Sequence, residues 1–225
     1  KEPYFIDVIT NAILNNVLTE DEKDFNQSIL YGKDINVFDL MTMARRAPMM
    51  SNYQLIVVKE AQLLSKIEEL DSYLKNPLKS TILVLCYKYE TLDKKSDKRK
   101  NFLKNVAQKG ILFESSELND YQIPDWIIKT VKESGFQIQK DIALMLSEFL
   151  GKDLTKINNE LKKPYLNLKK GEEIRSELIT SNIGISKDYN IFELQRFLSN
   201  KDVLKSNKII NYFIANRSEE HTSEL

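Results

Sequence analysis

The stretch Pro48-Met-Met-Ser-Asn-Tyr-Gln-Leu-Ile-Val-Val-Lys-Glu-Ala-Gln62 decides the fold class of this 225-residue chain. Its centre, Leu55 to Val58, is an unbroken apolar run rich in β-branched side chains. Such a run is typical of a strand buried on both faces, as in a parallel sheet covered by helices. Just upstream, Met49 and Met50 follow a proline at the expected corner between a helix and this strand. The corner is therefore a candidate site for an exposed apolar contact.

The two residues after this strand argue against hydrolytic chemistry. In nucleotide-hydrolysing α/β domains, an acidic pair at this point helps to hold Mg²⁺ and to position the attacking water. Here the pair is Lys59-Glu60, and the positive charge of a lysine opposes a metal ion. The sequence also contains no GxxxxGK[ST] phosphate loop. We interpret Lys59 and Glu60 as a degenerate Walker B position without a catalytic role. Lys59 can also be an ordinary surface residue at a strand end, and in either case no metal-binding aspartate is present.

Composition sets further limits on function. Hydrophobic residues make up 42% of the chain and charged residues 29%, as in an ordinary globular protein. No apolar run approaches the roughly 20 residues that span a bilayer, so we expect a cytoplasmic protein without a membrane partner. The one cysteine, Cys86, ends the apolar run Thr81 to Cys86 and is expected to be a buried small hydrophobe. We expect no metal site and no cofactor.

Both ends of the sequence are unusual. The last nine residues, 217–225, resemble the translation of a sequencing-adapter oligonucleotide, and we exclude them from fold reasoning. This exclusion removes His221, the only histidine, together with one arginine and three glutamates. It leaves 32 of the 33 basic residues and 30 of the 33 acidic ones. The first residue is Lys1 rather than methionine, and we expect the chain to be an internal fragment of a longer gene product.

Hydrophobic periodicity predicts an α/β domain over residues 1–118. Apolar runs indicate strands, and apolar residues three or four apart indicate amphipathic helices. Strands that alternate with helices at this spacing imply βαβ units and a mostly parallel sheet. The expected strands are Phe25–Tyr31, 53–58, Thr81–Cys86 and Ile111–Phe113; the expected helices are 4–18, Val37–Ala44, Ala61–Leu74 and Lys98–Ala107.

The pattern becomes helical after residue 118. A small helical domain is expected over 119–186, without strands, and two further helices over 187–216 are expected to begin another helical domain. Trp126 is expected in the core because it shares a helical stripe with Ile127 and Val131. Six helices are expected in this part of the chain. The first begins at Pro124, and the third runs from the N-cap Asp153 to an end or kink at Pro164. The second and the last three cover Ile142–Leu150, Glu172–Ser181, Ile191–Leu198 and Asp202–Ala215.

Five motifs in this order resemble the delta subunit of bacterial DNA polymerase III, a clamp-loader subunit of the AAA+ class, over residues 1–216. The resemblance implies an AAA+-like parallel α/β domain, N-terminally truncated, followed by a helical lid domain and the start of an α-helical collar domain. The motifs are Glu2–Asp7, Pro48–Ser51 with Leu55–Gln62, Val84–Lys88, Phe113–Ser115 with Pro124–Trp126, and Gly184–Leu194.

The resemblance also implies a role. The delta subunit binds the ring-shaped sliding clamp and favours an open interface, so that the ring can be placed on primed DNA. It has no catalytic site of its own, although it belongs to a DNA-directed DNA polymerase holoenzyme, a nucleotidyltransferase. Its implied partners are the sliding clamp, the other clamp-loader subunits and primed DNA. Pro48, Met49 and Met50 match the family's clamp contact, where many relatives carry Leu-Phe or Phe-Phe.

Several alternatives stay open at this stage. The two methionines can instead be core residues at a helix end. An active AAA+ ATPase whose phosphate loop was lost by truncation, and a structural adaptor of another complex, are the competing functions. A lysine-rich stretch is a candidate DNA contact, although a solvated helix face is the favoured explanation; its residues are Lys94, Lys95, Lys98 and Arg99.

Overall fold

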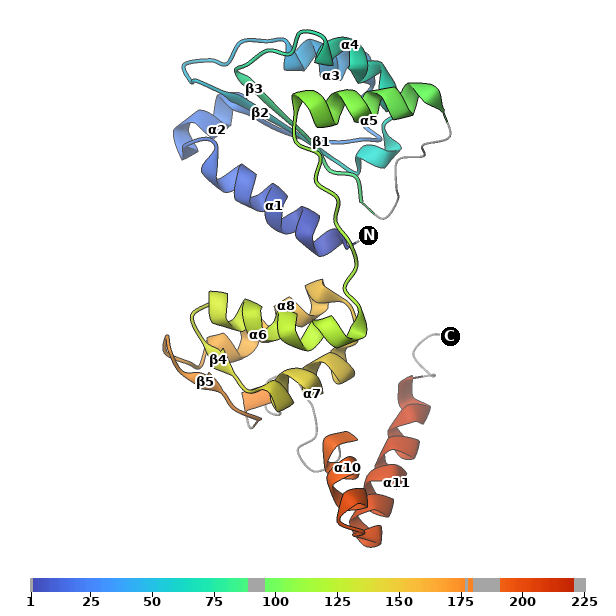
Figure 1. Cartoon of the computed structure of the whole chain (residues 1–225). Coiled ribbons are helices and arrows are strands. Elements are labelled where there is room, and N and C mark those ends of the chain that lie inside the picture. The colour runs from blue at the N-terminus through green and yellow to red at the C-terminus, as the bar shows by residue number, and fades with distance from the viewer. Residues whose placement is uncertain (1, 89–95, 177, 180–190, 221–225) are drawn as a thin grey trace. The chain divides into compact units, whose positions relative to one another are not determined.

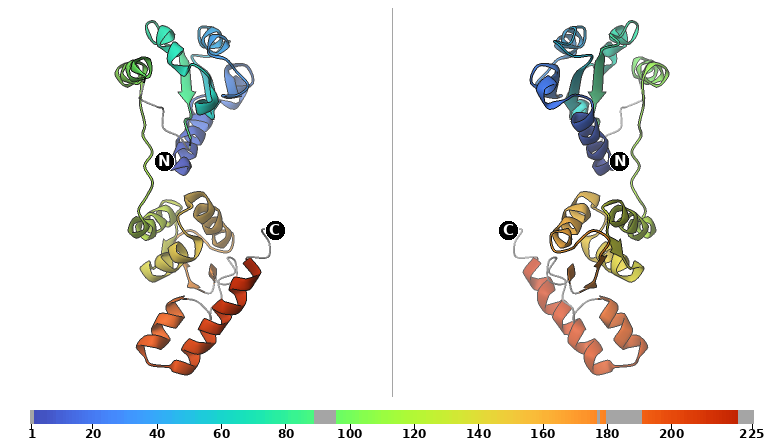
Figure 2. Two further views of the ribbon diagram at one scale, coloured as in Figure 1. Left: turned by 90° about the vertical axis from the view of Figure 1, so that its right-hand side faces the viewer. Right: turned by 90° about the vertical axis from the view of Figure 1, so that its left-hand side faces the viewer.

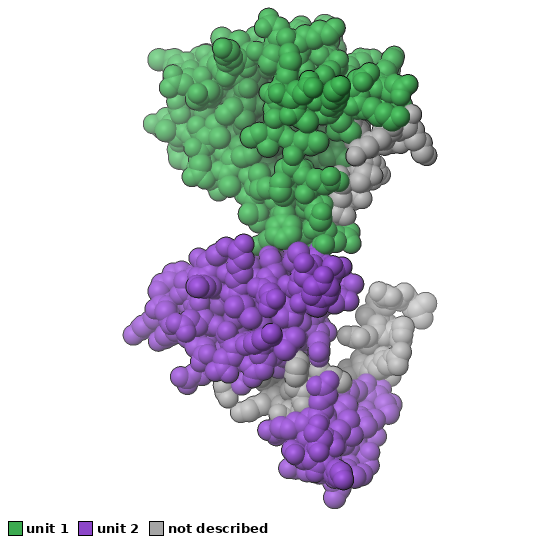
Figure 3. All heavy atoms as spheres, in the orientation of Figure 1, with its two compact units in different colours: residues 1–117 green, residues 118–225 purple. Residues whose placement is uncertain are grey.

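A computed structural model describes the chain except for residues 1, 89–95, 177, 180–190 and 221–225. The chain divides into two compact units, Lys1–Glu117 and Leu118–Leu225 (Figure 3). Within the described residues, no helix combines the length and the apolar character that crossing a membrane requires.

The first unit is built on a parallel sheet of three described strands. These are β1 (Gln27–Tyr31), β2 (Gln54–Lys59) and β3 (Thr81–Leu85), in the spatial order β1-β2-β3. Ile29 of β1 lies beside Val57 of β2, which lies beside Val84 of β3. The central strand β2 is the most buried, because residues Leu55 to Val58 are at most 1% exposed. The prediction of a strand buried on both faces is confirmed.

Helices cover both faces of this sheet (Figure 1). The helix α1 (Pro3–Asn16) covers one face, where its Leu14 packs with Leu55 and Val57. The other face carries α3 (Val37–Ala44), α4 (Asp71–Leu74) and α5 (Asp97–Lys109). The two cores thus take alternate side chains of β2, as the period of two along a strand requires.

The predicted continuous helix over Ala61–Leu74 is wrong. The segment forms two 3₁₀ turns, η1 (Ala61–Leu63) and η2 (Ile67–Leu70), which run into the short helix α4. Lys66 has a left-handed backbone with φ 56°, which breaks a continuous helix. The apolar residues Leu64, Ile67 and Leu70 are nevertheless buried. A spacing of three residues fits separate 3₁₀ turns as well as one α-helix.

Two other predictions in this unit need correction. Ile111–Phe113 is not a strand but an irregular segment, and Ile111 is 94% exposed. A three-residue apolar run forms a strand only where a neighbouring strand pairs with it, and no described strand does so. Phe25 and Asn26 end the helix α2 (Glu20–Asn26), which starts with a capping box between Thr19 and Glu22, so the strand begins at Gln27.

The second unit is mainly helical. After the turn η3 (Asp120–Gln122) come α6 (Ile123–Glu133), α7 (Lys140–Leu150) and α8 (Leu154–Tyr165). Ile127, Leu146, Ile157 and Leu161 are fully buried in this unit. Pro164 lies in the last turn of α8, which ends one residue later as predicted. Further along the chain, α10 (Ile191–Ser199) and α11 (Val203–Glu220) form a helical hairpin (Figure 2).

The expectation of no strand between 119 and 186 is wrong. Two short strands, β4 (Gln137–Ile138) and β5 (Glu173–Ile174), pair in parallel. The start of the helix expected from Glu172 is therefore a strand. Two-residue strands are too short to produce a period in the sequence. Trp126 is half-buried rather than part of the fully buried core.

Gly32 is required where the chain leaves β1. A Cβ atom at Gly32 would lie 2.3 Å from the carbonyl oxygen of Glu60. We therefore expect Gly32→Ala to force the backbone apart and to lower the free energy of unfolding by about 1–3 kcal/mol, measured by urea denaturation. Gly110→Ala is the control, because its Cβ would approach no atom closer than 3.3 Å. Equal losses in the two variants would contradict this steric explanation.

Candidate functional site

The corner between α3 and β2 is the strongest candidate for a functional site. We define residues 45–53 as the methionine loop. Met49 is 55% exposed and Met50 is 99% exposed, whereas Pro48 is half-buried. Large apolar side chains on a surface point to a contact with another molecule more often when they are adjacent than when they are scattered. The alternative that these methionines are core residues does not fit their exposure.

Met50 has an unusual backbone conformation. Its φ is 53°, in the left-handed region that non-glycine residues rarely adopt. This conformation costs on the order of 1–2 kcal/mol for a residue with a Cβ atom. Such a conformation persists only where the surrounding structure fixes it. The contacts that hold the methionine loop are therefore part of the site.

Helix α2 supplies the first anchor of the methionine loop. The Met49 N–H donates to Asn26 Oδ1 at 2.6 Å, and Asn26 Nδ2 donates to the Met49 carbonyl at 2.9 Å. Glu22 lies four residues before Asn26, and its carboxylate accepts the Thr19 N–H and the Thr19 hydroxyl, each at 2.9 Å. The Thr19 N–H, followed by the Ser51 and Thr19 hydroxyls, holds the pKa of Glu22 below the usual 4.5. The end of the helix thus holds the loop at Met49.

The second anchor is the carboxyl end of α3, where helix carbonyls lack partners within the helix. The Gln54 amide nitrogen donates to the Arg46 carbonyl and, at 2.7 Å, to the Thr81 hydroxyl. The Thr81 hydroxyl in turn donates to the Ala44 carbonyl at 2.8 Å, and the Tyr73 hydroxyl donates to the same carbonyl at 3.4 Å. Side chains from β2, β3 and α4 therefore fix the start of the loop.

Lys59 and Glu60 lie at the opposite end of β2. The Lys59 carbonyl accepts the Gly32 N–H at 2.8 Å, and Glu60 adopts a left-handed backbone with φ 51°. The Ala61 N–H donates to the Cys86 carbonyl at 2.9 Å. Across the parts of the chain that the structure describes, no group of three or more His, Cys, Asp or Glu is placed to hold a metal ion.

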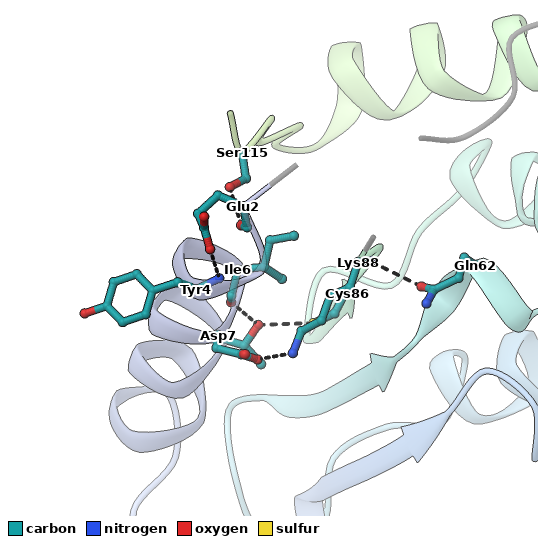
Figure 4. Close-up of polar contacts among 9 residues, drawn as sticks. Glu2, Tyr4, Ile6, Asp7, Gln62, Cys86, Lys88 and Ser115 are labelled. Atoms are coloured by element: carbon teal, nitrogen blue, oxygen red, sulfur yellow. Dashed lines mark hydrogen bonds and ion pairs between the residues drawn. The ribbon is translucent and has the colours of Figure 1, made fainter. Parts of the chain in front are cut away.

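The amino end of α1 is occupied by the protein's own carboxylate (Figure 4). Glu2 is the N-cap of this helix and accepts the Tyr4 N–H at 3.0 Å, and the Ser115 hydroxyl donates to the Glu2 carbonyl at 2.6 Å. Free helix N-termini attract phosphate groups because their N–H groups and the helix dipole favour an anion. A carboxylate at this position disfavours a second anion.

The neighbouring end of β3 is also closed by internal contacts (Figure 4). Lys88 forms an ion pair with Asp7 of α1, and its backbone N–H donates to the Gln62 side chain at 3.2 Å. Cys86 is buried, as predicted, and its sulfur lies 3.1 Å from the Thr10 hydroxyl. Burial raises the pKa of the Cys86 thiol, which keeps it neutral and unreactive.

The candidate DNA contacts are only partly described. Lys94 and Lys95 lie outside the described residues. Lys98 and Arg99 lie in the first turn of α5, where Lys98 is exposed. The Arg99 guanidinium lies 3.4 Å from the carboxylate of Glu68, which partly compensates its charge. A DNA contact at these residues stays a prediction.

Sequence reasoning missed the residues that hold the methionine loop. Asn26, Gln54 and Thr81 are ordinary polar residues in the sequence, and their partners lie 8 to 37 positions away. No local pattern marks such contacts. The burial of Asn26, which is 5% exposed, becomes visible only in the folded structure.

The fold resembles that of a known clamp-loader protein. The structure of the Bacillus subtilis DNA clamp loader delta protein (YqeN) matches with a TM-score of 0.67 and 24% identity, over 96% of this chain and 66% of that chain. A RuvB mutant of Thermotoga maritima matches with a TM-score of 0.41 and 12% identity, over 79% of this chain and 61% of that one. The predicted fold class, a parallel α/β unit followed by helical segments, is confirmed.

Sequence comparison gives the family. The family model described as DNA polymerase III, delta subunit matches residues 1–116, and the chain belongs to this family. DNA polymerase III subunit delta of Bacillus subtilis (strain 168) is 27% identical over 230 residues, which cover 98% of this chain and 65% of that protein. The chain therefore spans about 65% of the length of this relative.

The bonds that the Thr19 N–H and hydroxyl donate to Glu22 give a pH prediction. The pKa of Glu22 is lower in the folded protein, so its stabilising contribution is complete above the unfolded value near pH 4.5 and is lost as the pH falls through the folded value. We expect a carboxyl titration by NMR to place the Glu22 pKa below 4.5. Glu22→Gln should flatten the decline of stability below that pH, because it removes the carboxylate that titrates. A Glu22 pKa at or above 4.5 would show that the Thr19 bonds to this carboxylate are not made.

Proposed function

We propose that this chain is the clamp-binding subunit of a bacterial replicative clamp loader, and that it does not hydrolyse ATP. It binds the sliding clamp, favours the open ring, and acts with the other loader subunits to place the ring on primed DNA. The observation that carries this proposal is the exposed pair Met49 and Met50 on a loop that is anchored on both sides. Membership of the delta-subunit family supports the assignment.

The methionine pair has the energetic properties of a binding hot spot. Complete burial of one such side chain contributes roughly 1.5–3 kcal/mol, and a few side chains of this size dominate many interfaces. Methionine is flexible and polarizable, so it can fill an apolar pocket that relatives fill with leucine or phenylalanine. Because the backbone of the loop is already fixed, less conformational entropy is lost on binding.

Two features support a clamp-binding subunit that does not hydrolyse ATP. Lys59 stands where a metal-binding aspartate is needed for ATP hydrolysis. Glu2 places a carboxylate at the helix end where a phosphate would bind. Both features argue against the alternative of an active ATPase. We assign clamp binding to residues 1–118, the lid to 119–186 and the beginning of the collar to 187–216.

Removal of the methionine side chains tests the proposal. We expect Met49→Ala and Met50→Ala each to weaken binding of the full-length protein to the sliding clamp at least tenfold, equivalent to about 1.4 kcal/mol. The fold should be unaffected because both side chains are exposed. Affinity is measured by calorimetry or surface plasmon resonance.

Phe38→Ala is the matched control, because Phe38 is a large exposed side chain of the same unit and lies outside the methionine loop. This variant should bind like the wild type. Wild-type affinity in the double variant Met49→Ala/Met50→Ala would remove the pair from the interface. Absence of any binding by the wild type would favour the structural-adaptor alternative.

A further inference from the structure

We infer that Asn26 is a positioning residue for clamp binding, which fixes the backbone of Met49 so that Met50 is presented to the clamp. This inference rests on the proposed function. Asn26 lies at the end of α2, 23 residues before Met49, and no sequence motif connects the two residues. Their connection is a pair of hydrogen bonds that the fold brings together.

The side-chain amide of Asn26 pairs with Met49 as a neighbouring strand would. Its oxygen accepts the Met49 N–H at 2.6 Å, and its nitrogen donates to the Met49 carbonyl at 2.9 Å. The same nitrogen donates its second hydrogen to the Glu22 carbonyl at 3.2 Å. Both donors of the amide are therefore used, and the side chain is only 5% exposed. This arrangement needs one donor and one acceptor at the same distance from the backbone.

Few side chains can replace this amide. Aspartate has nearly the same shape but no hydrogen to donate to the Met49 carbonyl at neutral pH. Glutamine carries the same amide on a side chain that is one methylene longer. Alanine removes both bonds and leaves the Met49 N–H and carbonyl without these partners. Asparagine is the residue that satisfies both groups of Met49 from the end of α2.

The constraint at Met49 acts on the next residue. Met50 has its left-handed backbone, φ 53°, directly after the hydrogen-bonded residue. When the two bonds at Met49 are removed, water can satisfy the freed groups because Met49 and Met50 are exposed, and the loop can then leave the left-handed conformation. Only the fraction of molecules that retains the binding conformation binds the clamp, so the apparent affinity falls in proportion to that fraction.

A double-mutant cycle tests this role. Clamp affinity of the full-length protein is measured for Asn26→Ala in the wild-type background and in the Met49→Ala/Met50→Ala background. We expect a loss of about tenfold in the first background and less than twofold in the second, because the loop then has no methionine to present. In parallel, hydrogen exchange of the Met49 amide should change from protected in the wild type to unprotected in Asn26→Ala.

Two further variants separate positioning from general stability. Asn36→Ala removes an N-cap asparagine of α3, whose side chain accepts the Asp39 N–H at 2.9 Å, and should lower the melting temperature without weakening clamp binding. Asn26→Asp keeps the acceptor for the Met49 N–H and should give an intermediate loss of affinity. It also keeps the test available if Asn26→Ala does not fold.

The outcomes distinguish the inference from the function on which it rests. A loss of affinity in the methionine variants with wild-type binding by Asn26→Ala would overturn the role of Asn26 and leave the proposed function intact. Equal losses from Asn26→Ala in both backgrounds would also overturn it, because Asn26 would then act elsewhere. Wild-type binding by Met49→Ala/Met50→Ala would overturn the proposed contact and the inference together.

Discussion

The burial of β2 on both faces is the constraint on which the rest of the first unit depends. Leu55 and Val57 pack toward α1, whereas Ile56 and Val58 pack toward α3, α4 and α5. A strand with two apolar faces must be covered on both sides, and the chain must therefore turn sharply at each of its ends. The two candidate positions, the methionine loop and Lys59-Glu60, are these two turns. Their separation along β2 follows from the buried strand between them.

The two ends of β2 differ in chemistry. At the amino end, polar side chains from α2, β2, β3 and α4 satisfy the backbone of the corner and leave the methionine side chains on the surface. At the carboxyl end, the Lys59 carbonyl accepts the Gly32 N–H, and the Ala61 N–H donates to the Cys86 carbonyl. Apolar contact area is thus presented at one corner, and the other corner is used for packing. The proposed clamp binding without ATP hydrolysis needs this difference between the two ends.

Elements with an unbroken run of buried apolar residues could be predicted from the sequence. Elements that depend on a partner far away in the chain could not. The central strand could be predicted because four adjacent apolar residues, rich in β-branched side chains, are typical of a strand buried on both faces. Ile111–Phe113 has similar residue types, but a strand also needs a partner, which composition does not specify. The turns within Ala61–Leu74 share their apolar spacing with a helix, and the left-handed backbone of Lys66 separates the two outcomes. The methionine pair was found by its position, whereas its exposure depends on long-range contacts of Asn26 and Gln54.

The most direct measurement of the central claim uses the ε-methyl groups of the chain's five methionines as NMR probes. Full-length protein labelled at these methyls is titrated with the unlabelled sliding clamp. If the corner before β2 is the contact, the signals of Met49 and Met50 shift or broaden, and that of Met145 in the second unit changes only with the overall size of the complex. Binding of the clamp with the Met49 and Met50 signals unchanged would contradict the account.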